Sequence, residues 1–135
     1  MIALALRSRP PASLERYRVW FYAAAFYNLC WGSVVTVAAN SLAWQVVGMF
    51  VLVYAPAYWW VARQPERHAH LVAIALLGKI LGPLGLLASV AIGRASPNLA
   101  WVIVTNDVIW WPAFALYLRE AAQLRGGWRE FLAGA

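Results

Sequence analysis

Charged side chains are scarce in this sequence. They make up 12% of its 135 residues, whereas a soluble domain carries about 25%. Apolar side chains reach 64%, against about 45–50% in soluble domains. This composition excludes an ordinary soluble domain and indicates a single-domain integral membrane protein.

Metal-binding residues and catalytic motifs are also scarce. The single Cys30 excludes an internal disulfide and a cysteine-built metal site, and within its apolar run we interpret it as a packing residue. No glycine-rich phosphate loop or nucleophile elbow appears. His68 and His70 lack a nearby third ligand, so we expect solvated histidines; contact with anionic headgroups beside Arg63 and Arg67 is the alternative. The sequence therefore predicts no metal site and does not identify a cofactor.

Four apolar runs are each long enough to cross a bilayer, which takes about 20 residues. They predict transmembrane helices at 19–39, 42–62, 71–92 and 99–118. Asn40 and Ser41 leave a very short turn, and a charged loop covers 63–70. A basic segment precedes the helices at 1–18, and a basic tail follows at 119–135. We predict an all-α, four-transmembrane-helix bundle with kinked helices.

Arginine placement predicts the orientation of this bundle. Four crossings put both termini and the 63–70 loop on one side, and positive residues stay cytoplasmic. Arg94 stands alone on the other side. The predicted cytoplasmic side holds Arg7, Arg9, Arg16, Arg18, Arg63, Arg67, Arg119, Arg125 and Arg129. The net charge of +6 therefore fits a membrane topology with both termini cytoplasmic and lipids as partners, and does not indicate nucleic-acid binding.

The C-terminal residues WREFLAGA have two interpretations. They could lie on the membrane surface through Trp128, Phe131 and Leu132. A disordered tail is the alternative.

Polar residues predict a layer across the middle of the bundle. At about 1.5 Å of rise per residue, Asn28, Tyr54 and Lys79 lie about 12–13 Å from the cytoplasmic end of their helices, and Asp107 about 18 Å. A lysine stem spans the remaining offset. We therefore predict that Lys79 faces Asp107, with Asn28 and Asn106 as hydrogen-bond partners.

An ionised side chain in mid-membrane costs about 2.5–3.5 kcal/mol on insertion scales. Lys79 and Asp107 lower that cost if they pair. Intramembrane charge favours a functional site, while the alternative is a pair that fixes helix register without doing chemistry.

Prolines inside the predicted spans free backbone carbonyls. Pro83 cannot donate to the carbonyl of Lys79, and Pro112 cannot donate to that of Val108; Pro56 acts in the same way in the second span. In lipid, a freed carbonyl must find another donor or line a cavity. Kinks beside the polar layer therefore favour a pocket.

Helical spacing predicts the surroundings of this layer. Asp107, Trp110, Trp111 and Phe114 follow i, i+3, i+4 and i+7 spacing and so share one face. With Trp31, the two later tryptophans are expected to form apolar walls; lipid contact or helix packing is the alternative.

Small residues predict close helix contacts. Gly78, Gly82 and Gly85 form a small-residue face in the third span, which allows another helix to approach. Gly32 and Gly48 are expected to act in the same way in the first two spans.

Several motifs together resemble one family of small bacterial four-helix membrane proteins. The motifs are FYxxxFYNLCWG, WQVVGM followed by Tyr54 and Tyr58, GKxLGPxG and TNDxxWWPxF, over residues 17–118. The resemblance implies the topology and a multi-pass protein of the bacterial inner membrane, but no reaction. A looser likeness, in topology and a helix-borne acid, is to the sterol-isomerase and sigma-2-receptor group and to DoxX-like proteins.

The leading hypothesis is a membrane protein that binds a lipid-like or aromatic small molecule between its helices. Asp107 would transfer a proton or hydrogen-bond, and Lys79 would be its counter-charge; these two are the catalytic candidates if the protein is an enzyme. The alternatives are a structural or assembly subunit of a larger complex, and proton or ion movement along the polar layer, which would need a homo-oligomer. The predicted ligand-binding residues are Asn28, Trp31, Tyr54, Lys79, Asn106, Asp107, Trp110 and Trp111.

Overall fold

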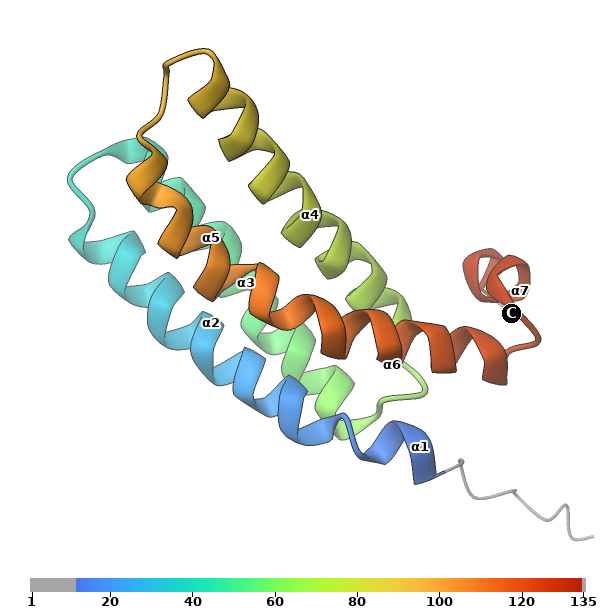
Figure 1. Cartoon of the computed structure of the whole chain (residues 1–135). Coiled ribbons are helices and arrows are strands. Elements are labelled where there is room, and N and C mark those ends of the chain that lie inside the picture. Colours follow the sequence, from blue (N-terminus) through green and yellow to red (C-terminus); the bar gives the residue numbers. More distant parts are fainter. Residues whose placement is uncertain (1–11, 135) are drawn as a thin grey trace, which may run out of the picture.

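The computed structural model describes residues 12–134, and this range is helical throughout apart from short connections (Figure 1). The elements are α1 (Ala12–Glu15), α2 (Arg18–Ala38), α3 (Leu42–Arg63), α4 (Ala69–Ala91), η1 (Pro97–Leu99), α5 (Ala100–Asn106), η2 (Val108–Trp110), α6 (Trp111–Leu124) and α7 (Trp128–Ala133). The predicted all-α architecture is confirmed for this range.

Four segments are long and apolar enough to cross a membrane, as the sequence predicts. They are α2, α3, α4 and the broken helix Pro97–Leu124. The first three begin and end within two residues of the predicted spans. The fourth runs further, because the alanines that follow Leu118 pack inside the protein: Ala121 and Ala122 are buried.

The bundle has two distinct ends (Figure 1). α1, α7 and the α3–α4 loop lie at one end, which we call the terminal end. The α2–α3 turn and the connection from α4 to η1 lie at the other, which we call the far end. Arg94 lies at the far end, and the terminal end carries the other described arginines. Arg7 and Arg9 lie outside the described residues.

α2 and α3 form a closely packed hairpin. A Cβ added to Gly48 would come 2.5 Å from the backbone nitrogen of Thr36, and one on Gly32 would come 2.7 Å from that of Leu52. Both distances are too short for any side chain, so the two backbones touch here. The hydroxyl of Ser41 caps α3 by accepting from the backbone N–H of Trp44 at 3.4 Å. The predicted close approach at the two glycines is confirmed.

The fourth span is broken at Asp107, which the sequence did not predict. α5 ends at Asn106, and Asp107 adopts φ −121° and ψ −62°, outside the helical region. A short 3₁₀ turn follows, and α6 begins at Trp111 with Pro112 in its first turn, where a helix needs no proline N–H. The backbone N–H of Trp111 donates to the carbonyl of Val108. The expectation that Pro112 leaves this carbonyl free is therefore wrong.

The terminal half of the bundle is filled by an aromatic core. Phe21 of α2 lies between Phe114 and Tyr117 of α6, with ring centroids 5.4 and 4.7 Å away, and Tyr58 of α3 lies 5.3 Å from Phe114. The hydroxyl of Tyr117 donates to the backbone oxygen of Pro65 in the α3–α4 loop. These contacts join α2, α3, α6 and the α3–α4 loop in the terminal half.

The C-terminal segment forms a short helix, α7, with one side packed on the bundle. Phe131 of α7 is buried in the core cluster, 5.3 Å from the guanidinium of Arg125. Phe131 therefore packs on the protein, against the expectation that it contacts the membrane, and 128–133 is helical and not a disordered tail. Trp128 and Leu132 are exposed.

Candidate functional site

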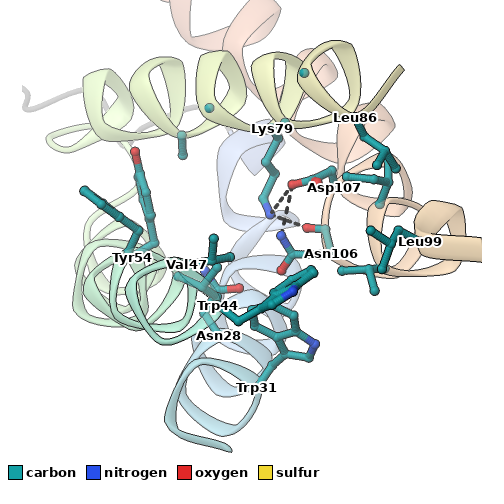
Figure 2. A pocket seen from close by; sticks show the side chains of 18 of the residues that line it. Asn28, Trp31, Trp44, Val47, Tyr54, Lys79, Leu86, Leu99, Asn106 and Asp107 are labelled. Atoms are coloured by element: carbon teal, nitrogen blue, oxygen red, sulfur yellow. Dashed lines mark hydrogen bonds and ion pairs between the residues drawn. The ribbon is translucent and has the colours of Figure 1, made fainter. Parts of the chain in front are cut away.

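A cavity of about 520 Å³ occupies the far half of the bundle (Figure 2). Its residues come from α2, α3, α4, the α4–η1 connection, η1, α5 and the break at Asp107, so the cavity is bounded by all four spans. They are Asn28, Trp31, Trp44, Val47, Phe50, Val51, Tyr54, Tyr58, Ala75, Gly78, Lys79, Gly82, Gly85, Leu86, Ser89, Ala95, Leu99, Val102, Ile103, Asn106 and Asp107. Six of the eight predicted ligand-binding residues are among them.

The predicted ion pair is present at the inner end of this cavity. Lys79 Nζ lies 3.8 Å from Asp107 Oδ1, and both side chains are buried (Figure 2). Lys79 Nζ also donates to the backbone oxygen of Asn106, and Asn106 Nδ2 donates to Asp107 Oδ1 at 3.1 Å. The break after Asn106 accounts for the first of these bonds, because the last carbonyls of a helix have no partner within it. The ion pair therefore lies beside the helix break, where the backbone oxygen of Asn106 is a third polar group of the site.

The carbonyl that Pro83 frees also finds a donor. The backbone oxygen of Lys79 accepts a hydrogen bond from Trp111 Nε1 at 3.1 Å. Pro83 lies four residues after Lys79 and has no N–H, so the indole of Trp111 replaces the missing helical bond. Lys79 therefore joins α4 to the fourth span through two hydrogen bonds, one from its side chain to Asn106 and one from Trp111 to its backbone oxygen.

Asn28 lies at the cavity without the predicted hydrogen bond. Its side chain is 2% exposed, and its Oδ1 has no donor among the described residues. Lys79 is satisfied instead by the carbonyl of Asn106, so the expectation that Asn28 is a partner of the pair is wrong for this arrangement. Tyr54 also lines the cavity and stacks on Tyr58, with ring centroids 5.9 Å apart.

The glycine face of α4 lines the cavity and does not pack on a helix. A Cβ on Gly85 would meet nothing within 4 Å, one on Gly78 would come 3.7 Å from the Tyr54 hydroxyl, and one on Gly82 would come 3.3 Å from Asp107 Oδ2. The expectation of a close helix at this face is therefore wrong. At Gly85 the missing side chain leaves open space, while at Gly82 it makes room for the carboxylate of Asp107. Lys79 projects from α4 into the cavity (Figure 2).

Trp110 and Trp111 do not line the cavity, so the expectation that they form its walls is wrong. The break at Asp107 rotates them away from the aspartate. Trp110 is buried against Tyr27 and Phe114, with ring centroids 5.7 and 6.3 Å away, and Trp111 bonds α4 as described. Both tryptophans contact residues outside the cavity lining or the backbone of α4. Trp31 lines the cavity as predicted.

Sequence reasoning missed Trp44 and Phe50 as lining residues. Trp44 lies near a helix end and fits an interfacial tryptophan equally well. Its i, i+3, i+7 spacing with Val47 and Val51 is a signal that could have placed all three on one face.

Metal-binding clusters of three or more His, Cys, Asp or Glu side chains do not occur in residues 12–134. At the terminal end, a second hollow of about 530 Å³ is lined by Trp60, Arg63, Gln64, Arg67 and His68. Burial, followed by the charges of Arg67 and His70, lowers the pKa of His68. His68 and His70 lie side by side, with ring centroids 6.3 Å apart.

Comparison with protein families, with curated proteins and with solved structures gives no match for this chain. The resemblance carried by GKxLGPxG and TNDxxWWPxF therefore stays a prediction. The geometry of the cavity carries the functional argument.

Proposed function

We propose that this multi-pass membrane protein binds a lipid-like or aromatic small molecule in the cavity of its far half. The observation that carries the proposal is the combination of an apolar, partly aromatic wall with one compact polar group at the inner end. Small-molecule sites are usually concave, about 300–1,000 Å³ in volume, and mostly apolar with a few placed polar groups. The cavity of about 520 Å³ fits this description.

The shape of the cavity suits an elongated molecule. Its lining on α4 runs from Ala75 to Ser89, which corresponds to about 21 Å at the helical rise. Lys79 lies toward the inner end, and Ser89, Ala95 and Leu99 lie near the far end of the bundle. A polar group of the ligand would bind at the inner end, with its apolar part directed toward the far end.

Asp107 and Lys79 are the groups proposed to act on the ligand. Asp107 Oδ1 is engaged by Lys79 and Asn106, while Oδ2 lies against Gly82 and has no hydrogen-bond partner among the described residues. This second oxygen is available to accept a hydrogen bond or a proton from the ligand. Lys79 would stabilise the negative charge of the carboxylate.

The arginines at the terminal end support an orientation with both termini in the cytoplasm. The cavity would then be nearer the outer face of a bacterial inner membrane. Lipids would surround the bundle, since large apolar side chains such as Phe26, Phe50 and Leu87 are exposed.

Proton or ion movement is less well supported. A conducting path would continue from the ion pair to the terminal end. Phe21, Tyr58, Phe114 and Tyr117 are fully buried there and fill the space between the helices. A subunit role in a larger complex is tested by co-purification of a stable partner at native expression.

Native mass spectrometry of the purified protein tests the proposal. A co-purifying lipid-like molecule is expected in the wild type, and Asp107→Asn should reduce its occupancy. Glu130→Gln is the matched control, because Glu130 is an exposed acid on α7. A wild-type protein without any bound small molecule, together with an Asp107→Asn protein that behaves identically toward a ligand panel, would contradict the proposal.

A further inference from the structure

The side-chain amide of Asn28 is a polar group that the fold leaves unsatisfied beside the cavity. The residue is 2% exposed, lines the cavity, and its Oδ1 has no donor among residues 12–134. A buried acceptor without a donor costs about 1–3 kcal/mol. The oxygen is covered in this arrangement, and because the terminal torsion of an asparagine is broad, the amide can turn this oxygen toward a molecule in the cavity.

Asn106 offers a second acceptor of the same kind. Its Nδ2 is engaged by Asp107 Oδ1, while its Oδ1 is buried without a donor. The cation at this end of the cavity is already engaged, since Lys79 Nζ binds the backbone oxygen of Asn106 and faces Asp107. Two carboxamide oxygens at this end of the cavity, those of Asn28 and Asn106, therefore have no donor among the described residues.

The formal charge of the lining is balanced. Lys79 and Asp107 are its charged residues and pair with each other. An anionic or cationic ligand would disturb this pair and bring an extra charge into the membrane interior, which is costly. An uncharged donor satisfies the free oxygens at no such cost.

The cross-section of the cavity is a slot. On one side runs the backbone of α4, which is open at Gly85 and meets only the Tyr54 hydroxyl at Gly78. Trp31 and Trp44 lie on the side opposite α4 (Figure 2). A flat ring system can lie between a side-chain-free helix face and aromatic rings, with stacking geometry available on the aromatic side.

We infer that the ligand is an uncharged, flat, ring-containing alcohol or phenol whose hydroxyl donates to Asn28 at the inner end of the cavity. This inference rests on the proposed function and specifies its ligand. The hydroxyl fits for a second reason, since its own oxygen can accept from other polar groups of the site.

Two matched probes test the inference. 4′-Bromobiphenyl-4-ol and its methyl ether differ in the donor, and bromine quenches nearby tryptophans such as Trp31 and Trp44. Quenching is measured with protein in nanodiscs and corrected with empty nanodiscs. The wild type should bind the phenol about tenfold more tightly than the ether, which corresponds to about 1.4 kcal/mol.

Asn28→Leu should reduce the phenol-to-ether ratio to about one while the ether binds as before. Asn28→Ala is a second variant with the same expectation, should the leucine disturb folding. Asn98→Leu is the matched control and should keep the wild-type ratio, because Asn98 is exposed in η1. Gly85→Leu should abolish binding of both probes, because its side chain would grow into open space along α4.

The outcomes distinguish failure of the inferred hydroxyl contact from failure of the proposed ligand binding. If phenol and ether bind the wild type equally and Asn28→Leu changes neither, the inference is overturned while ligand binding stands. If 4′-bromobiphenyl-4-carboxylate binds more tightly than the phenol, the uncharged ligand is overturned. If no probe binds the wild type and no small molecule co-purifies with it, the proposed function fails and the inference with it.

Discussion

The indole N–H of Trp111 lies 3.1 Å from the backbone oxygen of Lys79, the one carbonyl of α4 that Pro83 deprives of its helical donor. One residue of α4 thus meets the fourth span with its backbone and, at Asp107, with its ammonium group. The two contacts hold the break of the fourth span beside the cavity. The tryptophan is structural in this arrangement, although it adjoins the charged pair.

Trp111→Phe should lower the free energy of unfolding by about 1–3 kcal/mol, because the Lys79 carbonyl would lose its donor in an apolar setting. In a Pro83→Ala background the cost should be smaller, since the substituted alanine supplies the helical N–H. Reversible unfolding in detergent, arranged as a double-mutant cycle, measures the difference. Trp101→Phe is the control, at an exposed position in α5. Equal costs in both backgrounds would mean that the indole bond does not replace the helical one.

Lys79→Met should destabilise the protein by about 3–5 kcal/mol, because it leaves the Asp107 carboxylate buried without its counter-charge. Lys79→Met combined with Asp107→Asn should recover much of that loss, since neither charge remains. Thermal unfolding of both variants in the same detergent decides the matter. A double variant no more stable than the single one would contradict this expectation, and the difference between the double variant and the wild type measures the net contribution of the pair.

Gly48→Ala should separate α2 from α3 and lower stability by about 1–3 kcal/mol, because its Cβ would overlap the Thr36 backbone. Gly85→Ala is the matched control on α4, where a Cβ meets nothing within 4 Å. It should leave stability unchanged or raise it through higher helix propensity. Comparable losses at the two positions would argue against the backbone contact between α2 and α3.

His68 should titrate below the ordinary histidine pKa of about 6.5, because burial and then the charges of Arg67 and His70 lower its pKa. A lowered pKa means that the unfolded chain binds more protons, so the contribution of His68 to stability is present above pH 6.5 and is lost as the pH falls through the folded pKa. NMR of histidine-labelled protein measures the titration. Arg67→Gln should raise the pKa partway toward its ordinary value, while Arg129→Gln should leave it unchanged.

Much of this arrangement could be predicted from the sequence. The lengths of the apolar runs predict the spans, since bilayer thickness fixes them. Counting helical rise places Lys79, Asp107, Asn28 and Tyr54 at matching depth, and all four line one cavity. Because Pro83 has no N–H, the sequence predicts that the Lys79 carbonyl lacks its helical donor, and the structure supplies one from Trp111 of the fourth span.

The break at Asp107 could not be predicted, and two wrong expectations follow from it. An unbroken 3.6-residue period puts Trp110 and Trp111 on the face of the aspartate, but a new helix starts at Trp111. Pro112 then occupies a first turn, where proline fits without loss. The glycine face of α4 was misread for a different reason. Small residues allow a neighbour to approach, but the positions of the other spans decide whether a neighbour or empty space is there.

The touching backbones at Gly32 and Gly48 also bear on the order of assembly. The α2–α3 hairpin leaves the ribosome before α4 and the fourth span, and its tight turn and bare glycine contact use no residue of these later spans. In membranes, helices insert and then associate by packing, so this pair can associate while the rest of the chain is still being synthesised. The later spans would then pack against the preformed α2–α3 hairpin. The cavity between α4 and this hairpin would be the last feature of the bundle to form.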